Sequence, residues 1–202
     1  MDFQGKLCKQ ERYVNKTTEF EDCDYTQDRE EYAINVRNQV AGLNAIYGTV
    51  KNMEPVYLDD QYDCIDRYII NVQSDLYGEV NFIVTSNTYL VDCFYDIIGT
   101  KVIGFFDPSL PMLLIYPPQY QIRVLALDLP GRSVKADFFD CFLVSLDDQL
   151  QLEISNNTYI TSEENGKPYC DNISNKYMVA LYSVATRSIP AITKPNVLIV
   201  LR

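Results

Sequence analysis

Cysteine is the residue type in this 202-residue chain whose spacing most suggests chemistry. Cys64 and Cys93 are 29 positions apart, and so are Cys141 and Cys170. Buried thiols are one interpretation, because cysteine is among the residues most often buried. The equal spacing is also compatible with one disulfide in each half of the chain, although sequence alone does not give the Cα separation that a disulfide needs.

Cys8 and Cys23 stand apart from these pairs, in a polar N-terminal stretch. We expect them to be candidates for linking one subunit to another, which makes all six cysteines possible structural or inter-subunit residues. A zinc site is disfavoured, because the chain has no Cys-x-x-Cys pair and no histidine.

A cluster of carboxylates offers the second candidate chemistry: Asp59, Asp60, Asp63 and Asp66. Carboxylate oxygens are calcium ligands, so this stretch is a possible weak calcium loop. It lacks the central Gly and terminal Glu of an EF-hand loop. A solvated acidic loop is therefore the favoured interpretation.

The chain contains no histidine. This excludes catalytic systems that use imidazole as a base, and His-ligated metal centres. No Gly-rich phosphate-binding loop occurs either. We therefore expect a protein that is not an enzyme and has no cofactor, no resident metal and no catalytic residues.

Two stretches of the chain resemble one another without a gap, residues 80–92 and residues 150–162. Asn87-Thr88-Tyr89 falls on Asn157-Thr158-Tyr159, and most other pairs are chemically alike. An internal repeat of this kind indicates two copies of one structural unit.

Each copy contains short apolar or alternating runs, which predict β-strands. In the first copy we expect strands at 46–50, 68–72, 79–85, 102–106 and 122–127, with a hairpin turn at 74–78. In the second we expect them at 134–139, 149–154, 158–161, 176–183 and 197–201, with Asp147 and Asp148 in a turn. Gly48 is expected at a bulge or a close backbone approach, and the apolar loop 107–120 is expected to pack on the barrel.

These elements predict an all-β protein of two tandem, duplicated small β-barrels, of OB-like or Greek-key type. The competing arrangement is one two-sheet sandwich spanning both copies. We divide the chain into an N-terminal extended, cysteine-containing arm (1–44), a first β-unit (45–130) and a second (131–202). Residues 28–45 are ambiguous between a short helix and an edge strand, and we favour strand for residues 32–40.

Charge and hydropathy limit the partners. With 17 basic and 28 acidic residues the net charge is −11, which disfavours nucleic acid. No run has the length of a membrane span, and the N-terminus does not look like a signal peptide. We expect a protein made without a signal peptide.

Three segments carry a resemblance to a known group of proteins: residues 138–154, which begin Phe-Phe-Asp-Cys-Phe, residues 186–190 with 199–201, and residues 115–120. Together they resemble an uncharacterised β-rich family of anaerobic spore-forming bacteria, over about residues 45–201. The resemblance implies no activity. Members of that family read Thr-Thr-Arg-Ser-Ile-Pro and end in Cys, whereas this chain has Ala185 at the first position and ends in Arg202.

We expect a structural, self-assembling surface protein: a spore-coat, appendage or filament subunit. Its partners would be copies of itself, joined when the arm adds a strand to a neighbour and by disulfides. It would lie on the spore or cell surface, with the cytoplasm as the alternative. The alternative function is a β-barrel binding module for a carbohydrate, a peptide or a partner protein.

Overall fold

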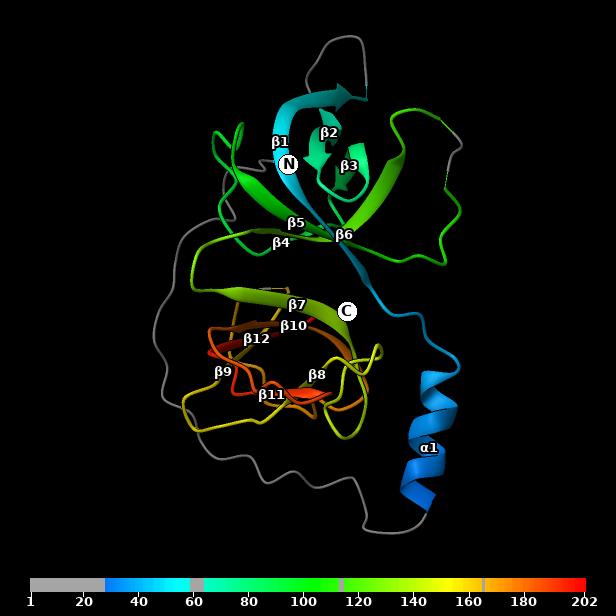
Figure 1. The fold of residues 1–202 in the computed structure, drawn as a ribbon, viewed down its shortest axis with the longest axis vertical. Helices are drawn as coiled ribbons and strands as arrows, with labels where there is room; N and C mark the ends of the chain where they lie inside the picture. The colour runs from blue at the N-terminus through cyan, green and yellow to red at the C-terminus, as the bar shows by residue number, and fades with distance from the viewer. Residues whose placement is uncertain (1–27, 59–63, 113–114, 165) are drawn as a thin grey trace. The chain divides into compact units, whose positions relative to one another are not determined.

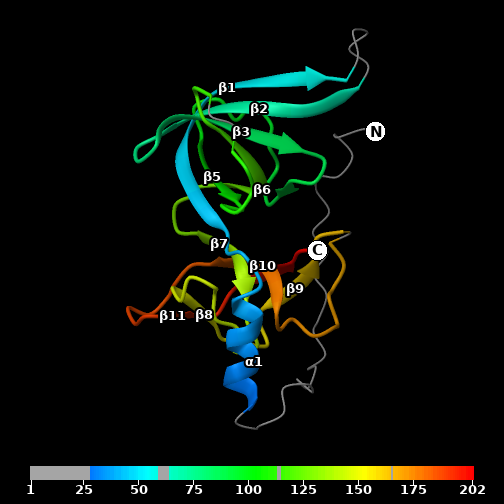
Figure 2. The ribbon, with the colours of Figure 1, turned by 90° about the vertical axis from the view of Figure 1, so that its right-hand side faces the viewer.

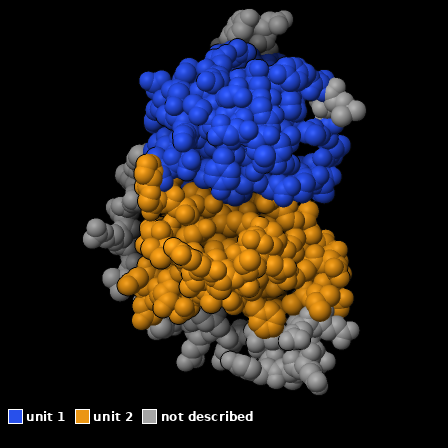
Figure 3. All heavy atoms as spheres, in the orientation of Figure 1, with its two compact units in different colours: residues 1–11, 44–129 blue, residues 12–43, 130–202 orange. Residues whose placement is uncertain are grey.

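The computed structural model describes residues 28–58, 64–112, 115–164 and 166–202 (Figure 1). This part of the chain is nearly all β, with one helix, α1 (Asp28–Arg37). It forms two compact units, coloured separately in Figure 3. Unit 1 comprises residues 44–129, and unit 2 comprises 28–43 and 130–202.

Unit 1 is a closed five-stranded barrel, as the sequence predicts (Figure 2). The barrel strands are β1 (Asn44–Tyr57), β2 (Ile65–Ser74), β3 (Gly78–Thr85), β5 (Lys101–Phe106) and β6 (Gln119–Leu127), and the two-residue strand β4 (Tyr89–Leu90) pairs in parallel with β6. The first three form an antiparallel meander. β3 then pairs in parallel with β6, β6 pairs with β5, and β5 returns to β1, which closes the barrel.

Alternation of side chains along β1 explains how the barrel encloses its core. Ile46 and Val50 are buried, whereas Tyr47 between them is 51% exposed. Gly48 lies on the inward side, where an added Cβ would be 2.5 Å from Val72 and 2.6 Å from the carbonyl oxygen of Gln73. The predicted close approach at Gly48 is thus confirmed: only glycine lets β1 and β2 come this near.

Unit 2 contains β7 (Ser133–Phe139), β8 (Leu150–Leu152), β9 (Tyr159–Ser162), β10 (Lys176–Tyr182), β11 (Ala191–Thr193) and β12 (Val197–Val200). Four strands form a sheet in the order β7-β10-β12-β9, and β8 pairs in parallel with β11. A single bridge from Phe139 to Ser145 continues β7 into a short hairpin. Phe139, Met178 and Leu198 are fully buried in the core of this unit.

The ten strands predicted for the two β-units are all present, but the strand favoured in the arm is not. Residues 32–40 do not form a strand, because α1 occupies them as far as Arg37. Arg37 stands in the last turn, where a cation interacts favourably with the helix dipole. β1 continues to Tyr57 through Pro55, which a strand tolerates where it lacks a neighbour on one side; the pairing of β1 with β5 ends at Thr49.

No helix in the described ranges has both the length and the apolar content needed to cross a membrane.

Candidate binding site

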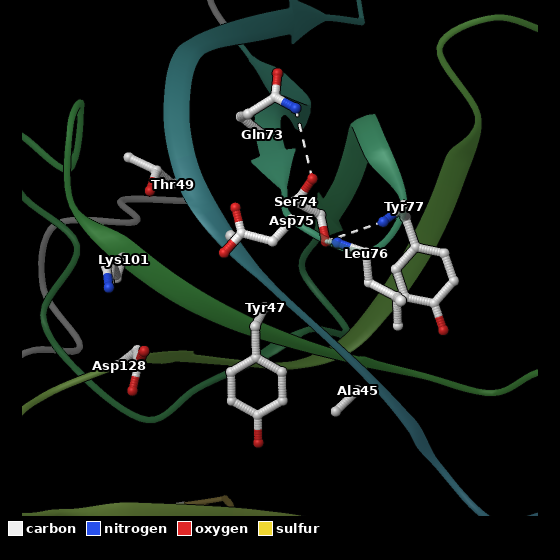
Figure 4. A pocket seen from close by; sticks show the side chains of 11 residues that line it. Ala45, Tyr47, Thr49, Gln73, Ser74, Asp75, Leu76, Tyr77, Lys101 and Asp128 are labelled. Carbon is white, nitrogen blue, oxygen red and sulfur yellow. Dashed lines mark hydrogen bonds between the residues drawn. The ribbon is translucent and has the colours of Figure 1, made fainter.

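A pocket of about 170 Å³ opens on unit 1, between β1 and the turn that joins β2 to β3 (Figure 4). It is lined by Ala45, Tyr47, Gly48, Thr49, Gln73, Ser74, Asp75, Leu76, Tyr77, Lys101 and Asp128. The pocket exists because β1 pairs with β2 only from Thr49 onward, so that the earlier residues of β1 diverge from the hairpin.

Ser74 fixes the turn at the edge of the pocket. Its Oγ accepts hydrogen bonds from the backbone N–H of Leu76 and Tyr77, each at 3.4 Å. The Tyr77 ring also makes an edge contact with Tyr120, with centroids 6.4 Å apart. The side chain of Leu76 is held in water, 82% exposed.

The labelled side chains in Figure 4 divide by chemistry. Lys101 and Asp128 lie on one side of the hollow, and Leu76 and Tyr77 lie on the other, with Tyr47 between them. Exposed apolar groups beside a few polar ones are typical of binding sites.

Unit 2 holds a segment of the chain, residues 41–43, beside β7 and β10. The backbone N–H of Leu43 donates to Oδ1 of Asp137 at 3.0 Å, and the hydroxyl of Tyr177 donates to the carbonyl oxygen of Ala41 at 2.7 Å. An added Cβ on Gly42 would lie 3.2 Å from Oδ1 of Asp137 and 3.5 Å from Leu146. Leu43 is 5% exposed, so residues 41–43 are bound through both backbone and side chain.

Arg37 continues this attachment at the end of α1. Its guanidinium donates to the carbonyl oxygen of Ser145 at 2.9 Å and to Asp148 at 2.5 Å. Nε lies 3.7 Å from the buried Asp140. Arg37 therefore ties the helix to the 140–148 turn, which contains the predicted Asp147-Asp148 turn.

Asp137 is the most unusual carboxylate in unit 2, being fully buried. Its Oδ1 also accepts from the N–H of Phe138, and its Oδ2 is 3.3 Å from Nζ of Lys135, an ion-pair contact. Burial raises the pKa of Asp137, against the opposing effect of Lys135.

The neighbouring Asp147 behaves in the opposite way. Desolvation opposes ionisation there, but hydrogen bonds from Lys135 and from Ser145 Oγ (2.7 Å) lower the pKa of Asp147. Its side chain is 44% exposed. Asp137 and Asp147 thus both form ion pairs with Lys135. These contacts connect β7 to the turn that contains Asp147, which is a structural role.

The four cysteines in the described part of the chain are all thiols, so the disulfide within each unit is not present there. Cys64 and Cys170 are exposed, Cys93 is half-buried and Cys141 is buried. The equal sequence spacing therefore does not bring the members of each pair into a bond. Cys8 and Cys23 lie outside the described residues.

The possible calcium loop falls largely outside the described residues, because Asp59, Asp60 and Asp63 do so. Asp66 is described, and its carboxylate forms a 2.6 Å ion pair with Arg67. Among the residues that the structure describes, no group of three or more acidic or cysteine side chains could hold a metal ion.

The large apolar side chains that the structure describes in the loop between β5 and β6 are exposed, contrary to the prediction that this loop packs on the barrel. Tyr116 is 83% exposed, and Leu110, Met112 and Ile115 are each about half exposed. At the ends of the loop, the rings of Phe106 and Tyr120 lie with their centroids 4.7 Å apart, tilted by 59°, and pack against the core. This loop is a second exposed apolar surface on unit 1.

Sequence reasoning did not find the pocket residues Tyr47, Leu76, Tyr77 and Lys101. The available signal was Leu76 and Tyr77, two large apolar residues within a predicted hairpin turn, where polar residues are usual. Comparison with known proteins adds nothing here: no family model matches the chain, and no curated protein matches it. The resemblance to the spore-former family rests on its three motifs alone.

Proposed function

We propose that the protein is a binding module rather than an enzyme, with the unit 1 pocket as its ligand site. The observation that carries the proposal is the pocket itself, where exposed Tyr47, Leu76 and Tyr77 adjoin Lys101 and Asp128. Aromatic rings with a polar tip are well suited to such surfaces, because they offer large contact area at small cost in side-chain entropy.

The proposal includes an OB-like barrel for unit 1. The closed order β1-β2-β3-β6-β5, with β3 and β6 parallel, supports it. OB-fold barrels bind ligands on the face of their second and third strands and on the loops that follow their first and fourth strands. The pocket is lined instead by the β2–β3 turn and β1, so the proposal rests on the lining residues and not on the fold.

We also propose that unit 2 is a contracted copy of this barrel. Matching turns support the duplication. Thr88 Oγ1 accepts from the N–H of Thr85 at 3.1 Å, and Thr158 Oγ1 accepts from the N–H of Ser155 at 3.2 Å. Both threonines are buried, and both belong to the repeated Asn-Thr-Tyr motif.

Strand pairing gives further support. The tyrosine after each of these threonines pairs in parallel with a valine, Tyr89 with Val124 and Tyr159 with Val197. The antiparallel neighbour of each valine also corresponds, because Val124 faces Phe105 and Val197 faces Leu181. Independent folds would not be expected to repeat these registers.

Binding is tested with the full-length, ¹⁵N-labelled chain and two probes: cellohexaose and a pool of unstructured decapeptides. We expect one probe to shift the resonances of Thr49 and of residues 73–77. Tyr47→Ala should weaken that binding at least about tenfold, equivalent to about 1.4 kcal/mol. The matched control is Tyr95→Ala, a unit 1 tyrosine that is 62% exposed away from the lining. Shifts confined to loop 107–120, or equal affinity in both variants, would reject the pocket.

A second candidate is the self-assembling surface protein, a spore-coat, appendage or filament subunit. It is favoured by one exposed thiol on each unit, Cys64 and Cys170, since accessible thiols can link subunits under oxidising conditions. Negative-stain microscopy with and without reductant tests it. Ordered fibres or sheets that reductant disperses would support assembly, and dispersed particles in both conditions would reject it.

A further inference from the structure

We propose that the outer face of the unit 1 sheet binds a neutral oligosaccharide. The face carries a row of four amide side chains, one on each of β1, β2, β3 and β6: Asn52, Asn71, Asn81 and Gln119. None of these four residues lines the pocket. The proposal therefore adds a second binding surface to unit 1 and does not depend on the first.

Strand register creates the amide row. Asn52 pairs with Asn71, Asn71 with Asn81, and Asn81 with Gln119. Directly paired residues place their side chains on the same face of a sheet, and a hydrogen bond of 3.0 Å from Nδ2 of Asn71 to Oδ1 of Asn81 joins two of them. Neighbouring strands lie about 4.8 Å apart, so the three intervals of the row span roughly 14 Å. This is long enough for a short oligosaccharide.

The other side of the same strands faces the barrel core. On β2, Ile70 and Val72 stand on either side of Asn71, and both are buried. On β3, Phe82 follows the amide and is also buried. On β6, Tyr120 follows the amide and packs against the same core. Successive side chains of a strand point to opposite faces, so the amide row points away from the core.

Beside the amide row lies a second row with apolar side chains at its centre. Ile69 pairs with Ile83, and both are half-buried on the outer face. Glu54 is paired with Ile69 at one end, and Gln121 with Ile83 at the other. A sugar ring whose hydroxyl groups are equatorial has C–H groups on its two faces and hydroxyls around its edge. The two isoleucines can contact such a face while the amides bind the hydroxyls.

The charges of this face favour a neutral ligand. The two rows contain no Lys or Arg, and their one acid, Glu54, accepts a hydrogen bond from Nδ2 of Asn52 at 2.6 Å. On the same face, Glu79 accepts from Nδ2 of Asn71 at 2.9 Å. These carboxylates repel phosphate and other anions, whereas amides and carboxylates both form hydrogen bonds with hydroxyl groups. A neutral molecule with many hydroxyls meets both conditions.

Backbone pairing disfavours a peptide on this face. A peptide that adds a strand to a sheet needs an edge with unpaired N–H and C=O groups. Around the amide row, β2 is paired with β1 and β3, and β3 is paired with β2 and β6. The ligand must therefore be held by side chains, which suits an oligosaccharide.

An exposed aromatic ring stands near the β6 end of the row. The N–H of Asn81 donates to the carbonyl oxygen of Pro118 at 2.8 Å, which holds the start of β6 beside β3. Tyr116 is two residues before Pro118 and is 83% exposed. Its ring can stack on the apolar face of a terminal sugar, because an aromatic side chain offers a large contact area.

On the proposed duplication, unit 2 has few amides at the corresponding positions. In the internal repeat, Gln151 stands where Asn81 stands in unit 1. Its neighbours on the adjacent segments are Val144 and Ile192, both apolar. The fold therefore does not require amides in this row, and Gln151 supplies a matched control.

Isothermal titration calorimetry of the full-length chain with cellohexaose tests the proposal. Wild type should bind, and the double variant Asn81→Ala/Gln119→Ala should bind at least about tenfold more weakly, equivalent to about 1.4 kcal/mol. Gln151→Ala should bind like wild type. Hexagalacturonic acid, of the same length but with a carboxylate on each ring, should not bind. Absence of cellohexaose binding, unchanged affinity in the double variant, or equal affinity for hexagalacturonic acid overturns the proposal.

Two further variants keep the result unambiguous. Tyr116→Ala lies in an exposed loop and does not disturb the sheet, so it tests the site even if the double variant fails to fold; it should weaken binding at least about threefold. Tyr47→Ala separates this proposal from the pocket. If Tyr47→Ala weakens cellohexaose binding and the amide double variant does not, the oligosaccharide lies in the pocket, and the proposed function stands while this proposal fails. If only the amide double variant weakens it, the outer face stands whether or not the pocket binds the decapeptides.

Discussion

Unit 1 has an open pocket beside its first strand, whereas unit 2 holds a segment of the chain beside its own first strand. In unit 1 the space between the first strand and the following hairpin is a pocket of about 170 Å³, whereas in unit 2 Asp137 and Tyr177 hold residues 41–43. The lengths of the hairpins account for the difference. In unit 1, β2 is a ten-residue strand paired along β1. In unit 2, the segment that follows β7 meets it through one bridge, between Phe139 and Ser145.

A shortened hairpin leaves backbone and apolar surface to be covered. Unit 2 covers them with its own chain, because buried polar groups need partners. In unit 1, β2 and β3 form a long hairpin beside β1, so no further segment of the chain is needed there to cover the sheet. The comparison teaches that the surface beside the first strand is covered by the chain itself in unit 2 and is open in unit 1.

Leu43→Ala should give the largest effect, because it removes the buried anchor of the filled place. We expect a loss of about 3 kcal/mol in the free energy of unfolding, as for other buried leucines. Urea denaturation measures it. The matched control is Leu76→Ala at the open pocket, which is 82% exposed and should cost less than about 0.5 kcal/mol. Similar losses in both variants would show that the two places do not differ in this way.

Gly48→Ala should have the next largest effect, because it disturbs the close approach of β1 to β2 in unit 1. The added Cβ would meet Val72 at 2.5 Å and backbone of Gln73 at 2.6 Å, and backbone yields less easily than the end of a flexible side chain. Overpacking of this kind costs about 2 kcal/mol, measurable by thermal denaturation. Thr49→Ala, on the next residue of β1, should cost less. An unchanged midpoint for Gly48→Ala would mean that the close approach of β1 and β2 is unimportant.

The strands of both units were predictable because short apolar or alternating runs between turn residues describe half-buried strands directly. Gly48 was predictable for the same reason, as a glycine inside a strand pattern. The helix that ends at Arg37 was not predictable from the sequence. Arg37 holds it in place by donating hydrogen bonds to the carbonyl oxygens of Ser145 and Leu146, which are more than a hundred residues away.

The pocket could not be predicted from the sequence either, although the hairpin turn at its edge could. Residues 74–78 were predicted as a hairpin turn, and β2 ends at Ser74 while β3 begins at Gly78. What the sequence does not contain is the divergence of β1 from that hairpin before Thr49, which depends on the curvature of the closed barrel. Asp137 was missed because nothing local distinguishes a buried aspartate that accepts distant N–H groups from an exposed one.

The smallest expected effect concerns that aspartate and its dependence on pH. Burial raises the pKa of Asp137 even though Lys135 opposes the rise. The folded state therefore binds this proton more tightly than the unfolded state. The carboxylate costs stability at neutral pH, and the cost disappears as pH falls through the folded pKa towards the unfolded value of 3.8.

Asp137→Asn keeps an oxygen for the N–H groups of Leu43 and Phe138 and removes the buried charge. At pH 7 we expect the variant to be as stable as wild type or more so, by up to about 1 kcal/mol. The difference should shrink as the pH is lowered from 7 towards 3.8, because the raised pKa lets the folded wild type take up this proton at a higher pH than the unfolded chain does. Urea denaturation at each pH measures it, with Asp75→Asn, in the exposed hairpin of unit 1, as the control. A variant clearly less stable than wild type at pH 7, with a gap that closes in acid, would show that the ion pair with Lys135 outweighs burial and that the filled place in unit 2 is held by charge.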